Sequence, residues 1–483
     1  MALGASDKAL TGHRERRIVL ALMTAAYTFN FVDRTIVAAI GQAIKDDLKI
    51  TDTQLGLLGG LYFALLYTIL GLPLARLAER MPRVNIISAA IFIWSGFTAL
   101  CGVATSYAAL AACRFGVGVG EAGLSPPAHS LLSDYYEPKK RASALSVYSL
   151  GVPIGVMIGA VAGGWIAQNY SWRIAFIALG LPGALLAVAI KLLVREPVRG
   201  AMEAKTPTPL KPYSLSEDVR ETGRVTRAMF GNFTLFNMMI GITLVSFAGY
   251  GGGTFVQPYW SRAFGLDYAQ IGLITGLIGG ASQGAGVLLG GLVSDRLARH
   301  GATIWYGLIP AIGIACAYPL ILGIYTADSW QAAATWMLFP GALSYTYMGP
   351  TYGVIQNAFP TERRATATAV LFFVLNLVAL GFGPPLTGWL IDHLGAFHRL
   401  YPDVDSLLPA LAGLGSVDAA AFQTSCPGGI GDVPGSTADL ACRAAVELAT
   451  RQGVLLAYGV SLWAALHYLL AAISLRRGMP TAQ

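Results

Sequence analysis

The sequence predicts an all-α polytopic membrane protein, with twelve transmembrane helices in two pseudo-symmetric six-helix bundles. Three observations predict this fold: the composition, the number of long apolar stretches and an internal repeat. Hydrophobic residues make up 55% of the 483 residues and charged residues only 12%, whereas soluble domains carry about 25% charged residues. So few charges cannot cover the surface of a soluble protein of this length, and the 57 glycines are typical of closely packed transmembrane helices.

Twelve apolar stretches are long enough to cross a bilayer, since a membrane span needs about 20 apolar residues. They cover approximately residues 18–40, 54–78, 84–105, 107–135, 140–168, 172–194, 227–257, 268–297, 302–326, 329–358, 364–393 and 444–475. Several stretches exceed 25 residues, so we expect tilted or kinked helices. The stretch GYGGGTFVQPYW near the end of the seventh span is expected to break or bend that helix.

A polar stretch rich in proline and charge divides the chain into two halves of six spans. We expect a cytoplasmic segment 1–17, a bundle 18–194, a cytoplasmic linker 195–226, a second bundle 227–475 and a cytoplasmic tail 476–483. The halves resemble each other, because GLPLARLAER after the second span matches GGLVSDRLARH after the eighth. A repeat at six-helix spacing is typical of a transporter built from two related halves.

The distribution of basic residues predicts the orientation. Of the 33 Lys and Arg residues, 24 fall on the side of the N-terminus, 7 on the opposite side and 2 within spans. Because basic loops stay in the cytoplasm, we expect both termini to be cytoplasmic in an inner, plasma-type membrane. This asymmetry explains the net charge of +7 without a nucleic-acid partner. The loop 394–443 is then external, and Cys426 and Cys442 within it are candidates for a disulfide.

Four charged residues lie deep within the first and fourth apolar spans. Asp33 and Arg34 belong to the first span, and Arg114 and Glu121 belong to the fourth. Asp33 and Arg114 each lie about 10 Å from the external end of their span, so they can pair if the two helices are neighbours. Glu121 is seven residues from Arg114 and shares its helix face. Charges in spans mark transport pathways by default.

Two other interpretations of these charges stay open at the level of sequence. One is a structural ion pair that fixes the helix register, and the other is that Asp33 and Arg34 extend to the external headgroups. In the functional interpretation, Asp33 or Glu121 exchanges a proton while Arg114 attracts the anionic head of a solute. Polar residues elsewhere in the spans are candidate cavity residues: Asn30, Tyr62, Asn237, Tyr345, Gln356 and Asn376.

The fourth span also contains a glycine pattern typical of dinucleotide-binding folds, Gly118-Val-Gly120-Glu-Ala-Gly123. That pattern binds a nucleotide only when it follows a strand in a βαβ unit, whereas here it lies in a helical apolar run. We therefore expect no enzyme activity, no cofactor and no metal, and a membrane oxidoreductase is only a remote alternative. Gly116 and Gly120 are four residues apart, which favours close packing against a neighbouring helix.

The two halves and their basic loops resemble the major facilitator superfamily. The loop signature of that superfamily matches Gly71, Arg76 and Arg80 in the first half and Gly291, Asp295 and Arg296 in the second. Ala75 stands where the first-half signature has Asp, which leaves the usual charge relay of that gating loop open to question.

Within the superfamily, NFVDRTIV, GLPLARLAER and RFGVGVGEAGLSPPAHSLLSDYY resemble the Spinster family. The resemblance implies alternating access and transport of lysophospholipids or, in animals, sphingosine-1-phosphate, with proton coupling in some members. Carried over by motif, Asp33, Arg34, Arg114 and Glu121 form the polar cluster. We therefore expect a monomeric secondary active transporter whose partners are protons, membrane lipids and a small amphipathic or anionic solute. The alternative is a transporter of a drug, a sugar or another organic anion.

Overall fold

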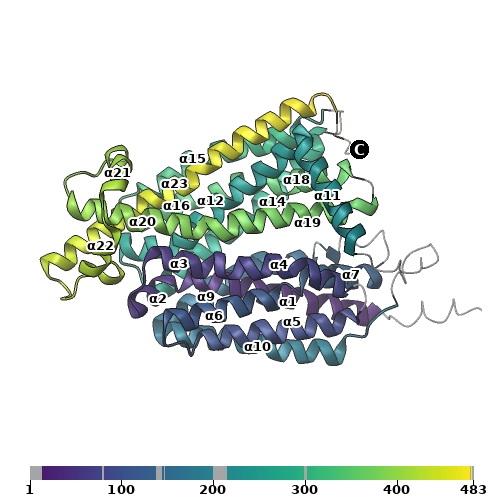
Figure 1. The fold of residues 1–483 in the computed structure, drawn as a ribbon, viewed down its shortest axis with the longest axis horizontal. Coiled ribbons are helices and arrows are strands. Elements are labelled where there is room, and N and C mark those ends of the chain that lie inside the picture. The colour runs from purple at the N-terminus through teal and green to yellow at the C-terminus, as the bar shows by residue number, and fades with distance from the viewer. Residues whose placement is uncertain are drawn as a thin grey trace, which may run out of the picture. The chain divides into compact units, whose positions relative to one another are not determined.

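The computed structural model describes residues 13–78, 81–136, 144–145, 147–198, 215–298, 302–359, 361–478 and 480. Within these residues the regular structure is helical and contains no strand, so the predicted all-α fold class is confirmed (Figure 1). The chain forms two compact units. Unit 1 comprises residues 1–36 and 65–213, and unit 2 comprises residues 37–64 and 214–483. This division follows the two predicted halves except for residues 37–64.

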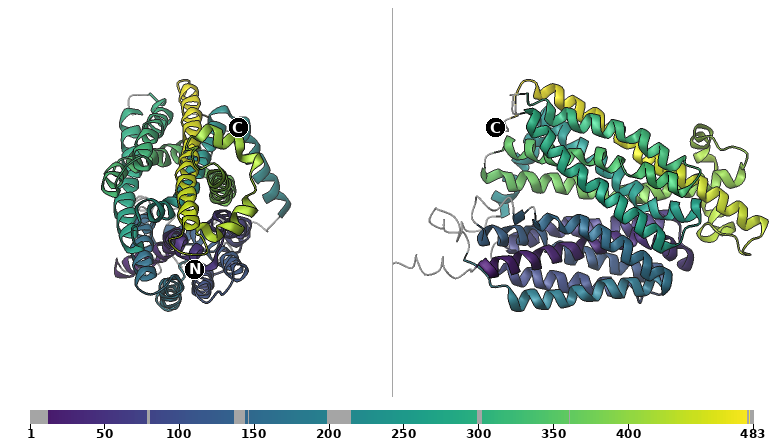
Figure 2. Two further views of the ribbon diagram at one scale, coloured as in Figure 1. Left: turned by 90° about the vertical axis from the view of Figure 1, so that its left-hand side faces the viewer. Right: turned by 180° about the vertical axis from the view of Figure 1, so that it is seen from behind.

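The long helices of unit 1 run side by side along one direction (Figures 1 and 2). Its helices, two of which extend into unit 2, are α1 (His13–Ala39), α4 (Leu61–Ala78), α5 (Arg83–Cys101), α6 (Tyr107–Glu121), α7 (Ser125–Tyr135), α9 (Gly151–Asn169) and α10 (Trp172–Leu193). The predicted fourth span is divided into α6 and α7, because the chain turns at residues 122–124, just before Pro126 and Pro127.

Unit 2 contains the remaining helices. They are α2 (Gly41–Leu48), α3 (Asp52–Gly59), α11 (Leu215–Gly231), α12 (Phe233–Phe264), α13 (Tyr268–Ile274), η2 (Thr275–Gly279), α14 (Gly280–Ala298), α15 (Trp305–Tyr325), α16 (Trp330–Met337), α17 (Pro340–Ser344), η3 (Tyr345–Tyr347), α18 (Met348–Ala358), α19 (Thr361–Leu375), η4 (Asn376–Phe382), α20 (Gly383–Leu400), α21 (Leu407–Gly413), η5 (Leu414–Ser416), α22 (Ala419–Ser425), η6 (Pro427–Gly429) and α23 (Thr437–Leu475). Segments η2 and η4 are π-helical turns within longer helices.

Membrane-spanning character is spread over both units. Among the described residues, nine helices are long and apolar enough to cross a membrane by length and composition. The first, fourth and tenth predicted spans fall outside these nine. The first corresponds to α1, which carries Asp33 and Arg34, and the fourth and tenth are interrupted as α6–α7 and α16–α18. The helix order therefore agrees with the predicted twelve-span architecture.

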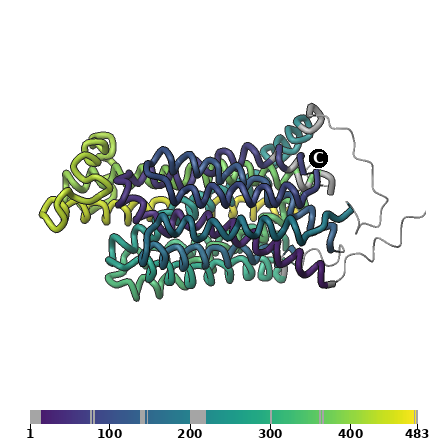
Figure 3. Tube along the Cα trace, turned by 90° about the horizontal axis from the view of Figure 1, so that it is seen from below, coloured from purple at the N-terminus to yellow at the C-terminus, as the bar shows by residue number. Residues whose placement is uncertain are grey.

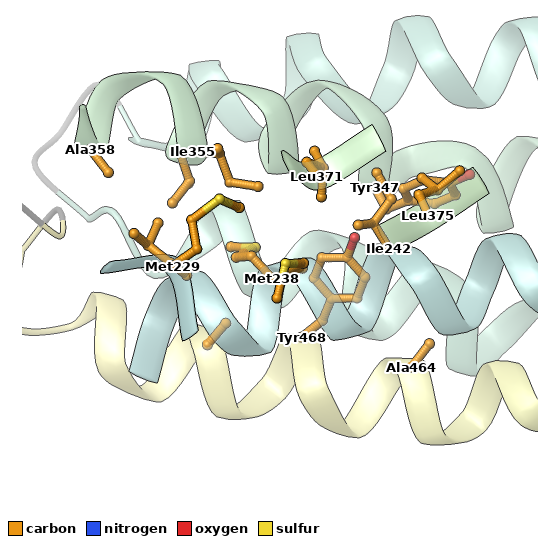
Figure 4. Close-up of a cluster of buried hydrophobic side chains, with 14 of the residues drawn as sticks. Met229, Met238, Ile242, Tyr347, Ile355, Ala358, Leu371, Leu375, Ala464 and Tyr468 are labelled. Atoms are coloured by element: carbon orange, nitrogen blue, oxygen red, sulfur yellow. The ribbon is translucent and has the colours of Figure 1, made fainter. Parts of the chain in front are cut away.

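An apolar core holds the helices of unit 2 together (Figure 4). Met238 and Ile242 of α12, Leu371 of α19 and Tyr468 of α23 are all completely buried in this cluster. The buried hydroxyl of Tyr468 is 2.7 Å from the hydroxyl of Thr351 in α18, so the one polar atom of this side chain has a partner.

The glycine-rich stretch does not break the seventh span, and a bend there stays a prediction. Helix α12 continues through the glycine-rich stretch to Phe264. A Cβ on Gly251 would lie 3.0 Å from the carbonyl oxygen of Gly383, and one on Gly252 would lie 2.6 Å from the ring of Tyr458. These two glycines let α20 and α23 approach α12, so tertiary packing overrides the weak helix propensity of glycine.

One end of unit 2 carries a folded loop between α20 and α23. It is shorter than the predicted loop 394–443, because α20 runs to Leu400 and α23 begins at Thr437. The short helices α21 and α22 lie at the same end of unit 2 as the start of α23 (Figures 1 and 3). The structure joins Cys426 and Cys442 in a disulfide, and Phe422 packs with both buried cysteines.

Glycines also let α5 and α6 pack closely in unit 1, as the sequence predicts. Ser106 caps the start of α6 by accepting a hydrogen bond from the backbone N–H of Ala109. Farther along α6, a Cβ on Gly120 would lie 2.5 Å from the backbone nitrogen of Trp94, and one on Gly116 would lie 2.4 Å from the ring of Phe97. Both distances are shorter than side-chain atoms tolerate.

We predict that Gly120→Ala destabilises the protein by about 1–3 kcal/mol, because overpacking forces the α5 backbone to move. The matched control is Gly96→Ala in α5, where an added Cβ meets no atom within 4 Å. The control should be neutral or stabilising, since alanine is the better helix former. Thermal unfolding in detergent measures both variants, and equal midpoints would contradict the packing described for α6.

Candidate functional site

The four charges predicted within the spans meet in the interior of unit 1. They come from α1 and α6, with α5 and α4 supplying further contacts. Asp33 is 3% exposed, and Arg114 and Glu121 are each 1% exposed. The side chain of Arg34 is the most accessible of the four, with an exposed fraction of 16%. Such burial requires each charge to be paired or hydrogen-bonded.

Asp33 uses both carboxylate oxygens. Arg114 donates from Nη1 to Oδ2 of Asp33 over 3.1 Å, and the hydroxyl of Thr98 in α5 donates to Oδ1 over 2.5 Å. The predicted contact between the first and fourth spans is therefore present. Because α5 adds the third group, this pair connects three helices of the unit.

Arg34 pairs with the other carboxylate of the cluster. Its Nε donates to Oε2 of Glu121 over 2.8 Å. The guanidinium carbon lies 4.7 Å from the ring centre of Tyr67 in α4 and 5.2 Å from that of Phe31 in α1, which are cation–π distances. By contrast, the buried Oε1 of Glu121 has no hydrogen-bond partner among the described residues.

The helix geometry explains why neighbouring residues choose different partners. Asp33 and Arg34 point about 100° apart around α1. Their partners Arg114 and Glu121 are seven residues apart on one face of α6, a separation of about 10 Å along the axis. The short Asp33 therefore reaches the nearer partner, whereas the long side chain of Arg34 spans the remaining distance.

The cluster carries two acids and two arginines and is therefore neutral when all four are ionised. The described residues contain no group of three or more His, Cys, Asp or Glu side chains arranged to hold a metal ion. An arginine side chain can bind an anion and a carboxyl group can exchange a proton, so the side chains of the cluster are suited to both.

The other candidate cavity residues are distributed over both units and remain predictions. In unit 1, Asn30 is 1% exposed, and its Oδ1 has no partner among the described residues. Tyr62 lies in the first turn of α4, in the segment that belongs to unit 2, and its side chain is half-buried.

Four further candidates lie in unit 2. Asn237 is buried in α12, where its Oδ1 is 2.7 Å from Nδ1 of His467 and its Nδ2 donates to the carbonyl of Phe233. Tyr345 and Asn376 are half-buried, and each begins an irregular turn, η3 or η4. Gln356 is exposed on α18.

The predicted gating-loop residues are only partly described. Gly71 lies in α4 and Gly291 in α14, and a Cβ on either would meet no described atom within 4 Å. Arg296 is exposed in the last turn of α14. The side chains of Arg76 and Asp295 lie outside the described residues, as does all of Arg80.

Sequence reasoning missed a buried arginine in unit 1. Arg83 begins α5 and is 0% exposed. It donates to Asp134 of α7 over 2.5 Å and to Glu196, just beyond α10, over 2.7 Å. In the sequence Arg83 directly precedes the predicted span 84–105, where a basic residue is ordinary and gives no signal.

A second group was also missed, in unit 2. It is defined here as the Asp52 network and consists of Lys45, Asp52, Arg262 and Asp392. Asp392 alone carried a signal in the sequence, because it lies within a predicted apolar span, where an acid calls for a partner.

A helical bundle with two related halves and paired charges in its interior defines a polytopic membrane transporter. The chain belongs to the major facilitator superfamily: the family model described as Major Facilitator Superfamily matches residues 23–384. Because this is a family of transporters, the remaining oxidoreductase interpretation of the glycine pattern is excluded.

Similarity to Spinster proteins agrees with the resemblance in the sequence. A solved structure of a bacterial homologue of the human lysosomal transporter Spinster, inward-facing and unoccupied, matches with a TM-score of 0.80 and 29% identity, over 96% of this chain and 98% of that chain. Protein spinster homolog 1 of Xenopus tropicalis is 28% identical over 80% of this chain and 75% of its own length. An MFS-type efflux pump of Mycolicibacterium smegmatis is 27% identical, over 79% and 86% respectively.

We predict that Arg114→Met destabilises the protein by about 3–5 kcal/mol, because it leaves Asp33 buried without its cation. The double variant Asp33→Asn/Arg114→Met should recover much of this loss, since it removes both charges. Thermal unfolding of the wild type, both single variants and the double variant gives the coupling energy of the pair. Strict additivity of the two substitutions would contradict a direct interaction.

Proposed function

We propose that this transporter is a proton-coupled secondary active transporter that works by alternating access. Its proposed solute is amphipathic and anionic, of the lysophospholipid or sphingosine-phosphate type, and crosses the inner membrane. The similarity to Spinster proteins supports the class of solute, and the buried charge cluster supports proton coupling.

The state of Glu121 is the observation that carries the proposal. A fully buried carboxylate with a purely structural role is expected to use both oxygens, as Asp33 does. Glu121 uses only Oε2, and Oε1 has no partner among the described residues. Burial favours the protonated form of a carboxyl group and a neighbouring arginine favours the ionised form, so a change around Arg34 can change the charge of Glu121.

We assign the binding of the anionic head to Arg34 rather than to Arg114. Arg114 is 1% exposed and its partner Asp33 is fully hydrogen-bonded, which suits a positioning role. Arg34 is the accessible arginine of the cluster. Phe31 and Tyr67 beside its guanidinium supply apolar surface next to the charge, which suits an amphipathic solute.

Proton and solute are then coupled through one contact. When a proton binds Glu121, its hold on Arg34 weakens, because a neutral carboxyl group attracts a guanidinium less than a carboxylate does. Arg34 becomes available to a phosphate or carboxylate head. When the head leaves, the ionised form of Glu121 is restored and the proton is released.

The proposed orientation places both termini in the cytoplasm and the α21–α22 loop outside. The disulfide between Cys426 and Cys442 in that loop supports it, since disulfides persist in oxidising compartments. We further propose that one chain suffices for transport, because the charge cluster is complete within unit 1.

The similarity to an efflux pump favours a second candidate function. In it, the same coupling site exports a drug or another organic anion. This candidate differs from the first in the solute and leaves the roles of Arg34 and Glu121 unchanged.

We predict that Glu121→Gln abolishes solute accumulation driven by a pH gradient but leaves solute exchange in the absence of a gradient. Glutamine keeps the size of the side chain and cannot exchange the proton. Transport in proteoliposomes, with and without an imposed gradient, measures both activities.

The matched control for this substitution is Glu447→Gln, because Glu447 is exposed on α23 outside the cluster. It should transport as the wild type does. Accumulation by Glu121→Gln at the wild-type level would remove Glu121 from the coupling mechanism, and loss of exchange in that variant would point to a structural role instead.

A competition experiment distinguishes the two candidate solutes. We predict that a lysophospholipid with an anionic head competes with a fluorescent lysolipid for the purified wild type, and that a small sugar acid does not. Arg34→Gln should weaken lysolipid binding about tenfold or more, since a charge-assisted hydrogen bond contributes about 1.5–3 kcal/mol. Competition by the sugar acid or a drug alone would favour the second candidate.

A further inference from the structure

The Asp52 network is centred on one buried carboxylate in unit 2. Asp52 is 1% exposed and accepts from Nζ of Lys45 over 2.5 Å. Arg262 of α12 binds it with two nitrogens, Nη2 to Oδ1 over 2.7 Å and Nη1 to Oδ2 over 3.2 Å. Two cations thus share one acid, and the two-pronged arginine contact fixes its orientation.

Asp392 of α20 accepts hydrogen bonds from the first residues of α3. Its Oδ1 accepts from the backbone N–H of Asp52 over 2.9 Å, and its Oδ2 accepts from the backbone N–H and the hydroxyl of Thr53 over 2.8 and 2.5 Å. The N-terminus of α3 therefore rests on a carboxylate, the arrangement that the helix dipole favours.

Arg262 makes two further contacts, one with α2 and one with α23. Its Nε donates to Oε1 of Gln42 in α2 over 2.8 Å, and its Nη1 donates to the hydroxyl of Thr450 in α23 over 2.5 Å. The segment α2–α3, named the hairpin and comprising residues 41–59, is thereby bound by polar contacts to α12 and α20, and Arg262 connects these contacts to α23.

The disulfide-linked loop covers the network. Gly428 and Gly429 follow Cys426 and have positive φ angles of 70° and 87°. A Cβ on Gly428 would lie 3.3 Å from the carbonyl oxygen of Lys45, and one on Gly429 would lie 3.5 Å from its Nζ. Lys45 is 0% exposed as a result. Desolvation lowers the pKa of Lys45, and Asp52 is the first group that opposes this shift.

The hairpin packs in one unit, whereas the chain before and after it belongs to the other unit. The hairpin lies within residues 37–64, which pack in unit 2, although the chain on both sides of them, residues 1–36 and 65–213, belongs to unit 1. In a transporter that works by alternating access, contacts between such a segment and one unit can form in one state and break in another.

The energetics of buried ion pairs allow the Asp52 network to open and close. The desolvation cost of a buried ion pair largely offsets the attraction between its charges, so a closed network and a hydrated, open one can be similar in free energy. A single unpaired charge in a closed network is strongly unfavourable, which makes closure depend on all members together.

We propose that the Asp52 network is a releasable latch, which holds the hairpin on unit 2 and opens during the transport cycle. Its members are positioning residues, since they act through the hairpin rather than on the solute. The loop closed by the disulfide excludes water from the latch while it is shut. The inference requires membership of the transporter family and is independent of the solute and of proton coupling.

The test measures the hairpin directly and needs no solute. Spin labels are placed on two exposed sites, Asp47→Cys in the hairpin and Gln270→Cys in α13, in full-length protein with the three free cysteines replaced by alanine: Cys101, Cys113 and Cys316. Pulsed dipolar spectroscopy in liposomes then gives the distance distribution. We expect Asp52→Asn to increase the ratio of separated to docked hairpin by about tenfold, equivalent to about 1.4 kcal/mol.

The matched control is Asp267→Asn, the same substitution at the residue that caps α13, where asparagine caps equally well. Its distance distribution should equal that of the wild type. Arg262→Lys keeps the charge but loses the two-pronged contact, so it should shift the distribution in the same direction and less far.

The alternative is that the network only stabilises the fold. In that case Asp52→Asn and Arg262→Lys would lower the thermal midpoint without adding a population at longer distance, and the latch would be overturned. Should Asp52→Asn fail to fold, the distribution of Arg262→Lys decides: a shift supports the latch and an unchanged distribution overturns it.

Discussion

The pairing of every buried charge is the constraint on which the interior of this protein depends. In a low-dielectric bundle an unpaired ion costs more than a typical contact contributes. The unit 1 cluster meets this constraint with Asp33–Arg114 and Arg34–Glu121, and the Asp52 network meets it with two cations and two acids. Both groups are neutral when fully ionised, and both join helices distant in sequence.

Function is proposed to arise where pairing is incomplete or reversible. Asp33 accepts hydrogen bonds on both carboxylate oxygens, so its ionised form is fully satisfied. Glu121 is equally buried but keeps one oxygen without a described partner, so its charge depends on what happens at Arg34. The difference between these two acids lies in their hydrogen bonds and not in their burial, and for that reason no hydropathy pattern distinguishes them.

Much of the fold and half of the charged architecture could be predicted from the sequence. Asp33, Arg34, Arg114 and Glu121 interrupt apolar runs, where a charge needs an explanation. Lys45 and Arg262 lie near predicted span ends, where basic residues are ordinary. Only the tertiary structure shows that Lys45 is 0% exposed and that the side chain of Arg262 is 7% exposed. In the glycine-rich part of α12, local propensity predicts a break that the helix does not have. Propensity cannot reveal that α20 and α23 pack into the space that side chains at these positions would fill.

The two proposals meet in one continuous piece of chain. Arg34 belongs to α1, which ends at Ala39, and Lys45 belongs to α2, which begins at Gly41. A shift of α1 that follows the exchange of Glu121 for a solute head would act on α2 through a single residue, Ile40, which is completely buried. The arginine that we assign to the solute and the lysine that we assign to the latch are therefore joined by a short stretch of continuous chain.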